Sequence, residues 1–590
     1  MPMSMTKRVG ALVCVLGLLG TPPARAQQVD VEEVVLDNGM TVLLLPRPGD
    51  PNVSAGWVAK VGSVYERPGI TGVAHLFEHM MFKGTSTIGT VNIEQDLQII
   101  AQLDQVKAEM RVEEAALLEA HRLGRIEDPN DPALRTSEHA ALIERFDALI
   151  QEQSELIIKE DFSRIYAGQG GSGMNAGTSY DYTIYFINVP ANKLELWFWM
   201  ESDRLLNPVF REFYSERDVV HEERRMRTDS TPTGKFEDQF DSLFWQSSPY
   251  GWPVVGWPSD LEGITREEAL SFFGLYYAPN NLTAALVGDF DPVEAKALAE
   301  RYFGRLPRSE RRPPQPRTRE MPQLGETRMT AYAETNPQVS IRYHSVPDGH
   351  VDEPPLVVLG QILNGRTGRL YRSLVEEQQV ATGAAGGQSG MKFEGMFTLD
   401  GTAKDGRTPE EVEQALYAEI ERLKTELVEP RELQKVKNQN AASNFRGLQS
   451  NYGLMTGLLV REAWRGWETI NTDQALYDAV TAEDVRRVAN TYFEPENRAV
   501  AIYYREESSE PEDPRLAGLD EQEREQVRQV MGMVAQATPE QLGQLASQVE
   551  QMGGQAPEEN QDMIAALREI VQERLVAGGA AGGAAGGARR

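Results

Sequence analysis

One helix-turn-strand pattern occurs twice in this chain at a constant offset, and this repeat constrains the fold more than any other feature. Both copies have a capped helix start, an aromatic helix end, a Pro-Asn turn and a strand, at Ile264–Glu268, Tyr276, Pro279, Asn281 and Leu282–Val287, and at Val480–Asp484, Tyr492, Pro495, Asn497 and Ala499–Tyr504. Such units are common, so a chance likeness is one interpretation. We favour the other, a duplicated domain that gives the chain two similar halves.

The first residues have the pattern of a targeting segment. Lys7 and Arg8 precede a short apolar stretch, Val9–Leu19, and a small-x-small cleavage site follows at Ala24–Ala26. We predict that residues 1–26 are a secretory signal, so that the product is exported to a periplasm or out of the cell. The only cysteine, Cys14, lies in a poor context for a lipoprotein, and no later segment is apolar enough to span a membrane.

Composition divides the rest of the chain. A Pro/Arg-rich stretch, residues 306–324, cannot continue a helix and is predicted to link an N-terminal half, 27–305, to a C-terminal half, 325–507. Residues 508–590 predict an acidic helical tail that ends in Gly/Ala-rich low complexity. The formal net charge of −30 argues against nucleic acid or an anionic membrane as a partner.

A helical pattern at about residues 93–162 looks like an insertion into the N-terminal half. Asp128–Pro132 interrupts the pattern, and each arm carries an apolar stripe at helical spacing. We therefore predict an antiparallel helical hairpin whose stripes pack on each other. His121 and His139 within it are expected to be exposed.

The run His75-Leu76-Phe77-Glu78-His79 predicts a metal site. Two histidines four residues apart share one helix face, so both imidazoles can reach one ion, and Glu78 is placed to touch a water on that ion. This His-x-x-Glu-His order is the reversed form of the zinc-protease helix. Zinc with an open coordination position makes a bound water acidic near neutral pH. A coincidence on a surface helix is the alternative, which the scarcity of histidine, 7 in the chain, disfavours.

Zinc needs a third protein ligand, and the stretch Glu216–Glu223 offers carboxylates. Glu216 and Glu223 are two helical turns apart on one face, whereas Glu222 is rotated off that face and His221 lies outside this spacing. One member of the pair could bind the metal while the other holds a ligand or the water in place. Taken alone, the stretch could equally be a solvated charged helix; the histidine motif makes the metal interpretation the stronger one.

The run Gly72–Thr85 resembles the active-site helix of the pitrilysin/insulinase family of zinc peptidases, with the bacterial, mitochondrial-processing-peptidase-like branch closest. Further stretches resemble the family's motifs in the family's order: Asn175–Tyr185 its Asn-Ala-x-Thr strand, Glu216–Glu223 its Glu-Arg-Asp-x-Val-x-x-Glu helix, and Ser248–Gly288 the end of its first half. The likeness covers residues 30 to 505 apart from the helical insertion.

The resemblance implies a role for each matching residue. His75, His79 and Glu223 match the zinc ligands, Glu78 matches the general base that activates the water, and Glu216 matches a supporting carboxylate.

The resemblance also implies that the strand with Asn175 and Ala176 pairs with an extended peptide substrate. An unpaired edge strand offers backbone donors and acceptors to any extended peptide. A simple turn role for Asn175 is the alternative.

Family members have an α+β fold of two similar halves, each a mainly antiparallel sheet packed with helices, which face each other as a clamshell around a chamber. The resemblance therefore implies a zinc-dependent endopeptidase that hydrolyses peptides or unfolded polypeptide segments. The alternative is a non-catalytic binding or assembly subunit of a peptidase-like heterodimer. Such members usually have a damaged zinc motif, and the motif here is intact.

One departure from the family concerns the second half, which usually supplies an Arg and a Tyr to the site. Val375 and Thr382 occupy those positions here. Losing both weakens the stabilisation of negative charge on the substrate carbonyl. We favour a related subunit that lacks the zinc helix and supplies Arg and Tyr in a heterodimer; a homodimer, or substitution by Arg369 or Arg372, is the alternative.

Overall fold

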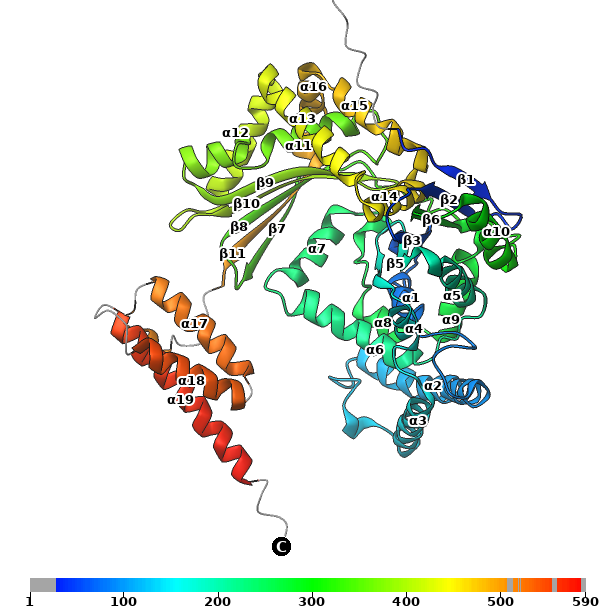
Figure 1. Ribbon diagram of the computed structural model, residues 1–590. Coiled ribbons are helices and arrows are strands. Elements are labelled where there is room, and N and C mark those ends of the chain that lie inside the picture. Colours follow the sequence, from blue (N-terminus) through cyan, green and yellow to red (C-terminus); the bar gives the residue numbers. More distant parts are fainter. Residues whose placement is uncertain are drawn as a thin grey trace, which may run out of the picture. The chain divides into compact units, whose positions relative to one another are not determined.

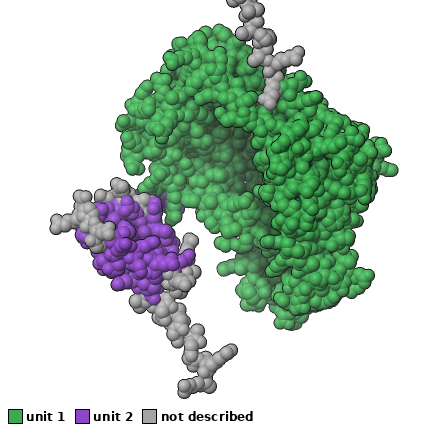
Figure 2. All heavy atoms as spheres, in the orientation of Figure 1, with its two compact units in different colours: residues 1–505 green, residues 506–590 purple. Residues whose placement is uncertain are grey.

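The computed structural model describes residues 28–506, 513–517, 519, 521–537, 539–553 and 560–584. The chain divides into two compact units, Met1–Arg505 and Glu506–Arg590 (Figures 1 and 2). The predicted secretory signal, residues 1–26, lies outside the described residues, as does the end of the Gly/Ala run after residue 584.

The first sheet of unit 1 has the strand order β1-β2-β6-β3-β5-β4. Its six strands are β1 Glu32–Val35, β2 Thr41–Pro46, β3 Asn52–Ala59, β4 Ser172–Thr178, β5 Thr183–Pro190 and β6 Leu282–Gly288. Neighbouring strands are antiparallel except β2 and β6, which are parallel. Every residue of β6 is buried, as expected for a central strand covered on both faces.

The second sheet repeats this topology, with the order β7-β11-β8-β10-β9. Its strands are β7 Thr327–Ala333, β8 Gln338–Ser345, β9 Ala381–Gly390, β10 Gly395–Ala403 and β11 Arg498–Arg505. Again one pair is parallel, β7 with β11, and it corresponds to β2 with β6. The prediction of two similar α+β halves is confirmed. Figure 2 shows that unit 1 is hollowed between these halves.

The repeated helix-turn-strand units have matching hydrogen bonds. Thr265 and Thr481 each begin a helix with a capping box, α9 Arg266–Tyr276 and α16 Ala482–Tyr492. After each helix an asparagine side chain closes the turn: Nδ2 of Asn281 donates to the Tyr276 carbonyl and Nδ2 of Asn497 to the Tyr492 carbonyl, both at 2.8 Å. The same local chemistry therefore starts β6 in one half and β11 in the other.

Helices cover both sheets (Figure 1). The other helices of the first half are α1 Val73–Met80, α2 Ile93–Arg122, α3 Ser137–Leu156, α4 Asp161–Gly168, α5 Leu194–Leu206, α6 Phe213–Arg224, α7 Gly234–Phe244, α8 Pro258–Gly263 and α10 Pro292–Tyr302. Those of the second half are α11 Glu353–Leu363, α12 Pro409–Thr425, α13 Pro430–Gly447, α14 Asn451–Trp464 and α15 Asp473–Ala479.

Helix α14 belongs to the second half by sequence but packs on the first sheet. Its buried residues Met455, Leu458 and Leu459 form one hydrophobic cluster with Val58 of β3 and Val287 of β6. A side chain at Gly56 of β3 would approach the Met455 sulfur to 2.9 Å, so the helix lies directly on the strand. The first sheet thus depends on the second half for one of its two covers.

The insertion is an antiparallel pair of helices, α2 and α3. Gln153 of α3 lies beside Asp96 of α2, and Thr136 before α3 donates to Glu113 at the far end. His121 is exposed as expected, but the expectation for His139 was wrong, since this side chain is buried. His139 lies one helical turn before Leu142 and so shares the apolar face of α3.

Unit 2 contains three α-helices among its described residues, α17 Glu521–Gln536, α18 Pro539–Gly553 and α19 Gln561–Ala584. They share a hydrophobic core of their own, which includes Val527, Leu542 and Leu567. In the part of the chain that the structure describes, no helix has both the length and the apolar character that crossing a membrane requires.

The position of α14 predicts a long-range effect of a cavity in this helix. Leu458→Ala should reduce the free energy of unfolding by about 2–5 kcal/mol and should speed amide hydrogen exchange in β3 and β6 of the other half. Leu476→Ala, at a side chain that is 51% exposed, is the matched control and should change neither. Exchange that accelerates only within the second half would contradict this packing.

Candidate metal centre

Helix α1 presents the His-x-x-Glu-His residues on the face opposite its core contacts. Val73, Leu76, Phe77 and Met80, at helical spacing, are all buried in the core of the first half. The opposite face carries His75, Glu78 and His79, and the two imidazole rings lie 5.0 Å apart between centroids.

The start of α1 is fixed by a buried carboxylate. Both oxygens of Glu66 accept backbone N–H groups, from Gly72 at 2.8 Å and from Ala74 at 2.7 Å. Burial raises the pKa of Glu66 to about 8. Gly72 itself has φ +91, and a side chain there would clash with the Val255 carbonyl. The helix that holds the histidines therefore begins at one defined point.

Helix α6 brings a carboxylate to the two histidines. Glu223 Oε2 lies 3.2 Å from His79 Nε2, and Glu223 Oε1 lies 3.8 Å from His75 Nε2. One ligand atom from each of these three residues lies within 4.8 Å of the other two. Arg227, whose side chain is 77% exposed, pairs with the same carboxylate at 2.6 Å.

Glu216, two turns earlier on α6, contacts the other nitrogen of His79. Its Oε1 lies 2.9 Å from His79 Nδ1, and its Oε2 lies 2.5 Å from the Lys83 ammonium. Burial opposes ionisation of Glu216, but these two partners outweigh it and lower its pKa. A hydrogen bond from Nδ1–H to Glu216 leaves the Nε2 lone pair of His79 directed at Glu223 and available to a metal.

The pKa values of the two histidines move in opposite directions. Burial and the neighbouring His79 lower the pKa of His75 to about 4, which favours its neutral form. For His79, burial acts downwards as well, but the hydrogen bond and charge of Glu216 outweigh it and raise the pKa. A metal binds only the neutral imidazole, so protons and a metal would compete for these rings.

Glu78 lies between α1 and the edge strand β4. Thr178 Oγ1 donates to Glu78 Oε2 at 2.7 Å, and burial raises the pKa of Glu78. Asn175 and Ala176 are on the same strand, at the edge of the first sheet. The Ala176 N–H donates to the Asn175 side-chain oxygen at 2.9 Å, so an incoming peptide would have to take its place.

One cavity of about 970 Å³ brings the predicted residues together. It is lined, among others, by His75, Glu78, His79, Asn175, Ala176, Thr178 and Glu223. Glu222, at its exposed side, pairs with Arg225 at 2.8 Å, and His221 lies 3.8 Å from Glu262. The structure therefore brings Glu223 to the histidine pair, while neither Glu222 nor His221 reaches it.

The second-half positions that depart from the family lie elsewhere. Thr382 is an exposed residue of β9, and Val375 packs at the edge of the second half's core. Arg369 forms a bidentate pair with Glu432, at 2.8 and 3.1 Å, and Arg372 is exposed. None of these four is among the residues that line the cavity with Glu78.

Two family models match the sequence. One, described as insulinase, peptidase family M16, matches residues 41–110, and one described as peptidase M16 inactive domain matches residues 263–440. The sequence thus resembles the M16 peptidases in both of its halves. The inactive-domain match includes α11, the first helix after β8, and the sequence of α11 contains no histidine.

The chain is similar to zinc protease PqqE of Helicobacter pylori, 26% identical over 472 residues, which cover 78% of this chain and 90% of PqqE. Zinc protease YmxG of Bacillus subtilis is 22% identical over 477 residues, which cover 80% of this chain and 98% of YmxG.

Solved structures share the fold. The crystal structure of a protease from Helicobacter pylori has a TM-score of 0.65 at 23% identity and covers 81% of this chain and 99% of that one. The periplasmic protease PqqL from Escherichia coli has a TM-score of 0.57 at 18% identity, with 81% of this chain and 48% of PqqL covered. The chain thus spans about half the length of PqqL.

Sequence reasoning missed three residues that position the site. Lys83 and Thr178 lie within the runs that resemble the family, but the sequence alone assigned neither of them a role in the site. Glu66 lies outside those runs, and no local pattern marks its contact with α1.

The capping role of Glu66 predicts a local effect of Glu66→Gln. The amide has one carbonyl oxygen, so one N–H at the start of α1 loses its acceptor, and stability should fall by about 1–3 kcal/mol. Hydrogen exchange in peptides that span α1 should accelerate, as measured by mass spectrometry. Glu222→Gln, at an exposed side chain, is the control. Unchanged protection of α1 in Glu66→Gln would rule out this capping role.

Proposed function

We propose that this protein is an exported zinc-dependent endopeptidase that cleaves peptides or unfolded polypeptide segments. The observation that carries the proposal is the convergence of His75, His79 and Glu223. Tetrahedral zinc with bonds of about 2.1 Å separates its donor atoms by about 3.4 Å. Glu223 Oε2 lies 3.2 Å from His79 Nε2, Glu223 Oε1 lies 3.8 Å from His75 Nε2, and one ligand atom from each of the three residues lies within 4.8 Å of the other two, which supports a zinc site.

Zinc, when bound, supplies a Lewis acid that acidifies water and polarises a peptide carbonyl. Glu78 takes the proton from the attacking water and passes it to the leaving amine. Thr178 holds Oε2 of Glu78 by a hydrogen bond and so fixes the direction of the carboxylate. Glu216, itself held by Lys83, orients the ring of His79.

The substrate strand lies along β4. An extended peptide pairs with the exposed edge at Asn175 and Ala176, which places its backbone beside Glu78 in the same cavity. Backbone pairing is independent of sequence, so it suits unfolded segments.

A related subunit completes the site. Val375 and Thr382 supply neither a cation nor a phenol to the cavity, and Arg369 is already paired with Glu432. The partner, a homologous chain without the zinc helix, contributes an Arg and a Tyr near the substrate carbonyl. The likeness to the periplasmic PqqL, of which this chain covers 48%, supports both the pairing and a periplasmic location.

The experiment measures bound zinc and then the cleavage of an unstructured peptide, with and without a candidate partner. Cleavage that requires the partner supports the proposal in full. Zinc without cleavage under either condition supports a non-catalytic binding subunit instead. Absence of zinc overturns the peptidase proposal.

The ligand assignment predicts that Glu223→Ala loses zinc, because two imidazoles alone hold the ion weakly. Its neighbour supplies a matched control, since Glu222 is exposed and paired with Arg225. Glu222→Ala should keep the zinc content of the wild type, as measured by elemental mass spectrometry. The reverse pattern would show that the wrong carboxylate has been assigned.

The proposed base predicts that Glu78→Gln keeps zinc and loses cleavage. The amide cannot accept the proton, so the turnover number should fall by about 10²–10⁴-fold. A quenched fluorescent peptide gives the rate, and the zinc content of the same sample is the control. Near-normal turnover in Glu78→Gln is the result that excludes this role.

A further inference from the structure

A second cavity opens beside Glu78 and His79, apart from β4. Its volume is about 530 Å³, and its lining comes from three segments: the end of α1 with Phe82 and Lys83, the start of α6 with Glu212 and Glu216, and the exit of the helical insertion at Ile157–Ser163. Both cavities include Glu78 and His79. A peptide bond placed at Glu78 therefore has a side-chain cavity at hand whose wall is supplied by the insertion.

Two apolar residues at the end of the insertion line the cavity and do not belong to the hydrophobic core. Ile157 and Ile158 are half-buried, line the cavity and are not part of the hydrophobic core of the first half. Phe82, also half-buried, faces the same space. The lining also includes charged side chains such as Lys83 and Glu216, so the apolar surface of the cavity is confined to the side formed by Ile157, Ile158 and Phe82.

The exit segment is held in place by its backbone. Val91 N–H donates to the Leu156 carbonyl at 2.9 Å, and Ile158 N–H donates to the Gly89 carbonyl at 3.1 Å. Gly89 N–H in turn donates to Asp161 Oδ2 at 3.0 Å. These hydrogen bonds fix the cavity wall to the loop that follows α1.

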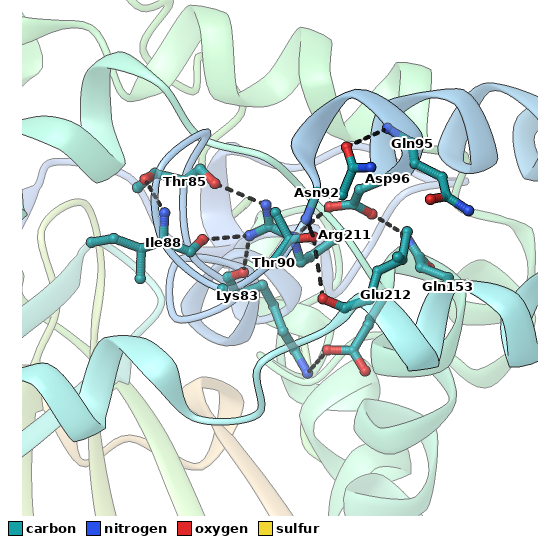
Figure 3. A network of polar contacts seen from close by, with 12 residues as sticks. Lys83, Thr85, Ile88, Thr90, Asn92, Gln95, Asp96, Gln153, Arg211 and Glu212 are labelled. Atoms are coloured by element: carbon teal, nitrogen blue, oxygen red, sulfur yellow. Dashed lines mark hydrogen bonds and ion pairs between the residues drawn. The ribbon is translucent and has the colours of Figure 1, made fainter.

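A buried ion pair, which we call the brace, holds the same loop in place (Figure 3). Arg211, whose side chain is inaccessible to solvent, pairs with the equally buried Asp96 of α2 at 2.8 Å. Its other nitrogens donate to the carbonyls of Lys83, Thr85 and Ile88, at 2.6 to 3.0 Å.

The insertion supplies both supports of this brace. Asp96 provides the counter-charge for Arg211, and Gln153 of α3 donates to the other oxygen of Asp96 at 2.9 Å (Figure 3). Gly84 and Gly89, both with positive φ, leave room for the guanidinium, since a side chain at either would approach Arg211 within 3 Å. Arg211 also immediately precedes Glu212 and α6, so one rigid frame joins the insertion, the loop and the helix with Glu216 and Glu223.

We propose that the helical insertion is a specificity-determining part of the substrate site, in which Ile157 and Ile158 form the wall that receives a large apolar side chain of the peptide. Asp96 and Arg211 are positioning residues that hold this wall. The inference rests on the proposed peptidase function and names the substrate side chain that the site selects.

The test changes the size of the wall in both directions. Ile158→Ala enlarges the cavity and should shift the preference towards bulkier side chains at one position beside the cleaved bond. Ile158→Trp fills the cavity and should shift it towards small ones. Each shift should be about tenfold in relative kcat/KM, the usual scale for changes of this size in an apolar pocket. Products of a mixed peptide library are identified by mass spectrometry.

The same insertion offers the control. Val112→Ala and Val112→Trp change a side chain of α2 that is 71% exposed and should leave the preference unchanged. Zinc content and thermal unfolding are measured for every variant, so that a loss of fold is recognised. Peptide affinity in the Glu78→Gln background gives a readout that does not depend on turnover and should shift in the same directions.

The outcomes separate this inference from the proposed function. Cleavage by the wild type with an unchanged preference in both Ile158 variants overturns the role of the insertion alone. Absence of cleavage by the wild type, with and without a partner, overturns both.

The brace has its own test. Asp96→Asn removes the counter-charge of Arg211 and should broaden the side-chain preference at the same position. Replacing residues 114–135 by a short turn removes the tip of the hairpin but keeps Asp96 and Gln153, and should leave the preference intact. A preference that is lost in the tip variant and kept in Asp96→Asn would contradict the assignment.

Discussion

The structure around the candidate site depends on the position of His79 between two carboxylates of α6. Glu216 contacts one ring nitrogen at 2.9 Å, and Glu223 lies 3.2 Å from the other. Two helical turns separate these carboxylates, so α6 must pass α1 at a fixed height and rotation for both contacts to form. The buried Arg211 sets that height, because it binds the loop after α1 and directly precedes α6. A shift of one residue at either helix start would separate all of these groups.

The two halves show how the same fold is used for different purposes. Asn281 and Asn497 close the same turn with the same hydrogen bond, and the five strands of the second sheet have the connectivity of the five that follow β1 in the first. Yet α11 follows β8 without a histidine, and its residues are almost all buried. The second half instead contributes α14, which covers the first sheet. The duplicated half thus stabilises the half that contains His75, His79 and Glu223, and the two could not be separated without exposing β3 and β6.

Local patterns in the sequence predicted what depends on local geometry. The spacing of His75 and His79 fixed a shared helix face, and the spacing of Glu216 and Glu223 did the same for α6, so these residues could be named before the fold was known. Asp96 and Arg211 could not, because neither has a motif and their pairing spans more than a hundred residues of chain. His139 was misplaced for a related reason: a histidine on an apolar helix face is buried or exposed according to its partner helix, which periodicity alone does not identify.

The two sides of the site differ in what they can contribute to substrate selection. On the β4 side, a peptide that binds Ala176 N–H replaces the bond this group already makes with Asn175, so the net gain in free energy is small. Backbone pairing there aligns the peptide but distinguishes poorly between sequences. On the opposite side, the half-buried Ile157 and Ile158 offer apolar surface to the cavity, and its burial by a side chain is a gain that depends on the size of that side chain. Selectivity of the proposed peptidase should therefore arise where the insertion meets α1, and the rigidity of the Arg211 frame is what would make that selectivity sharp.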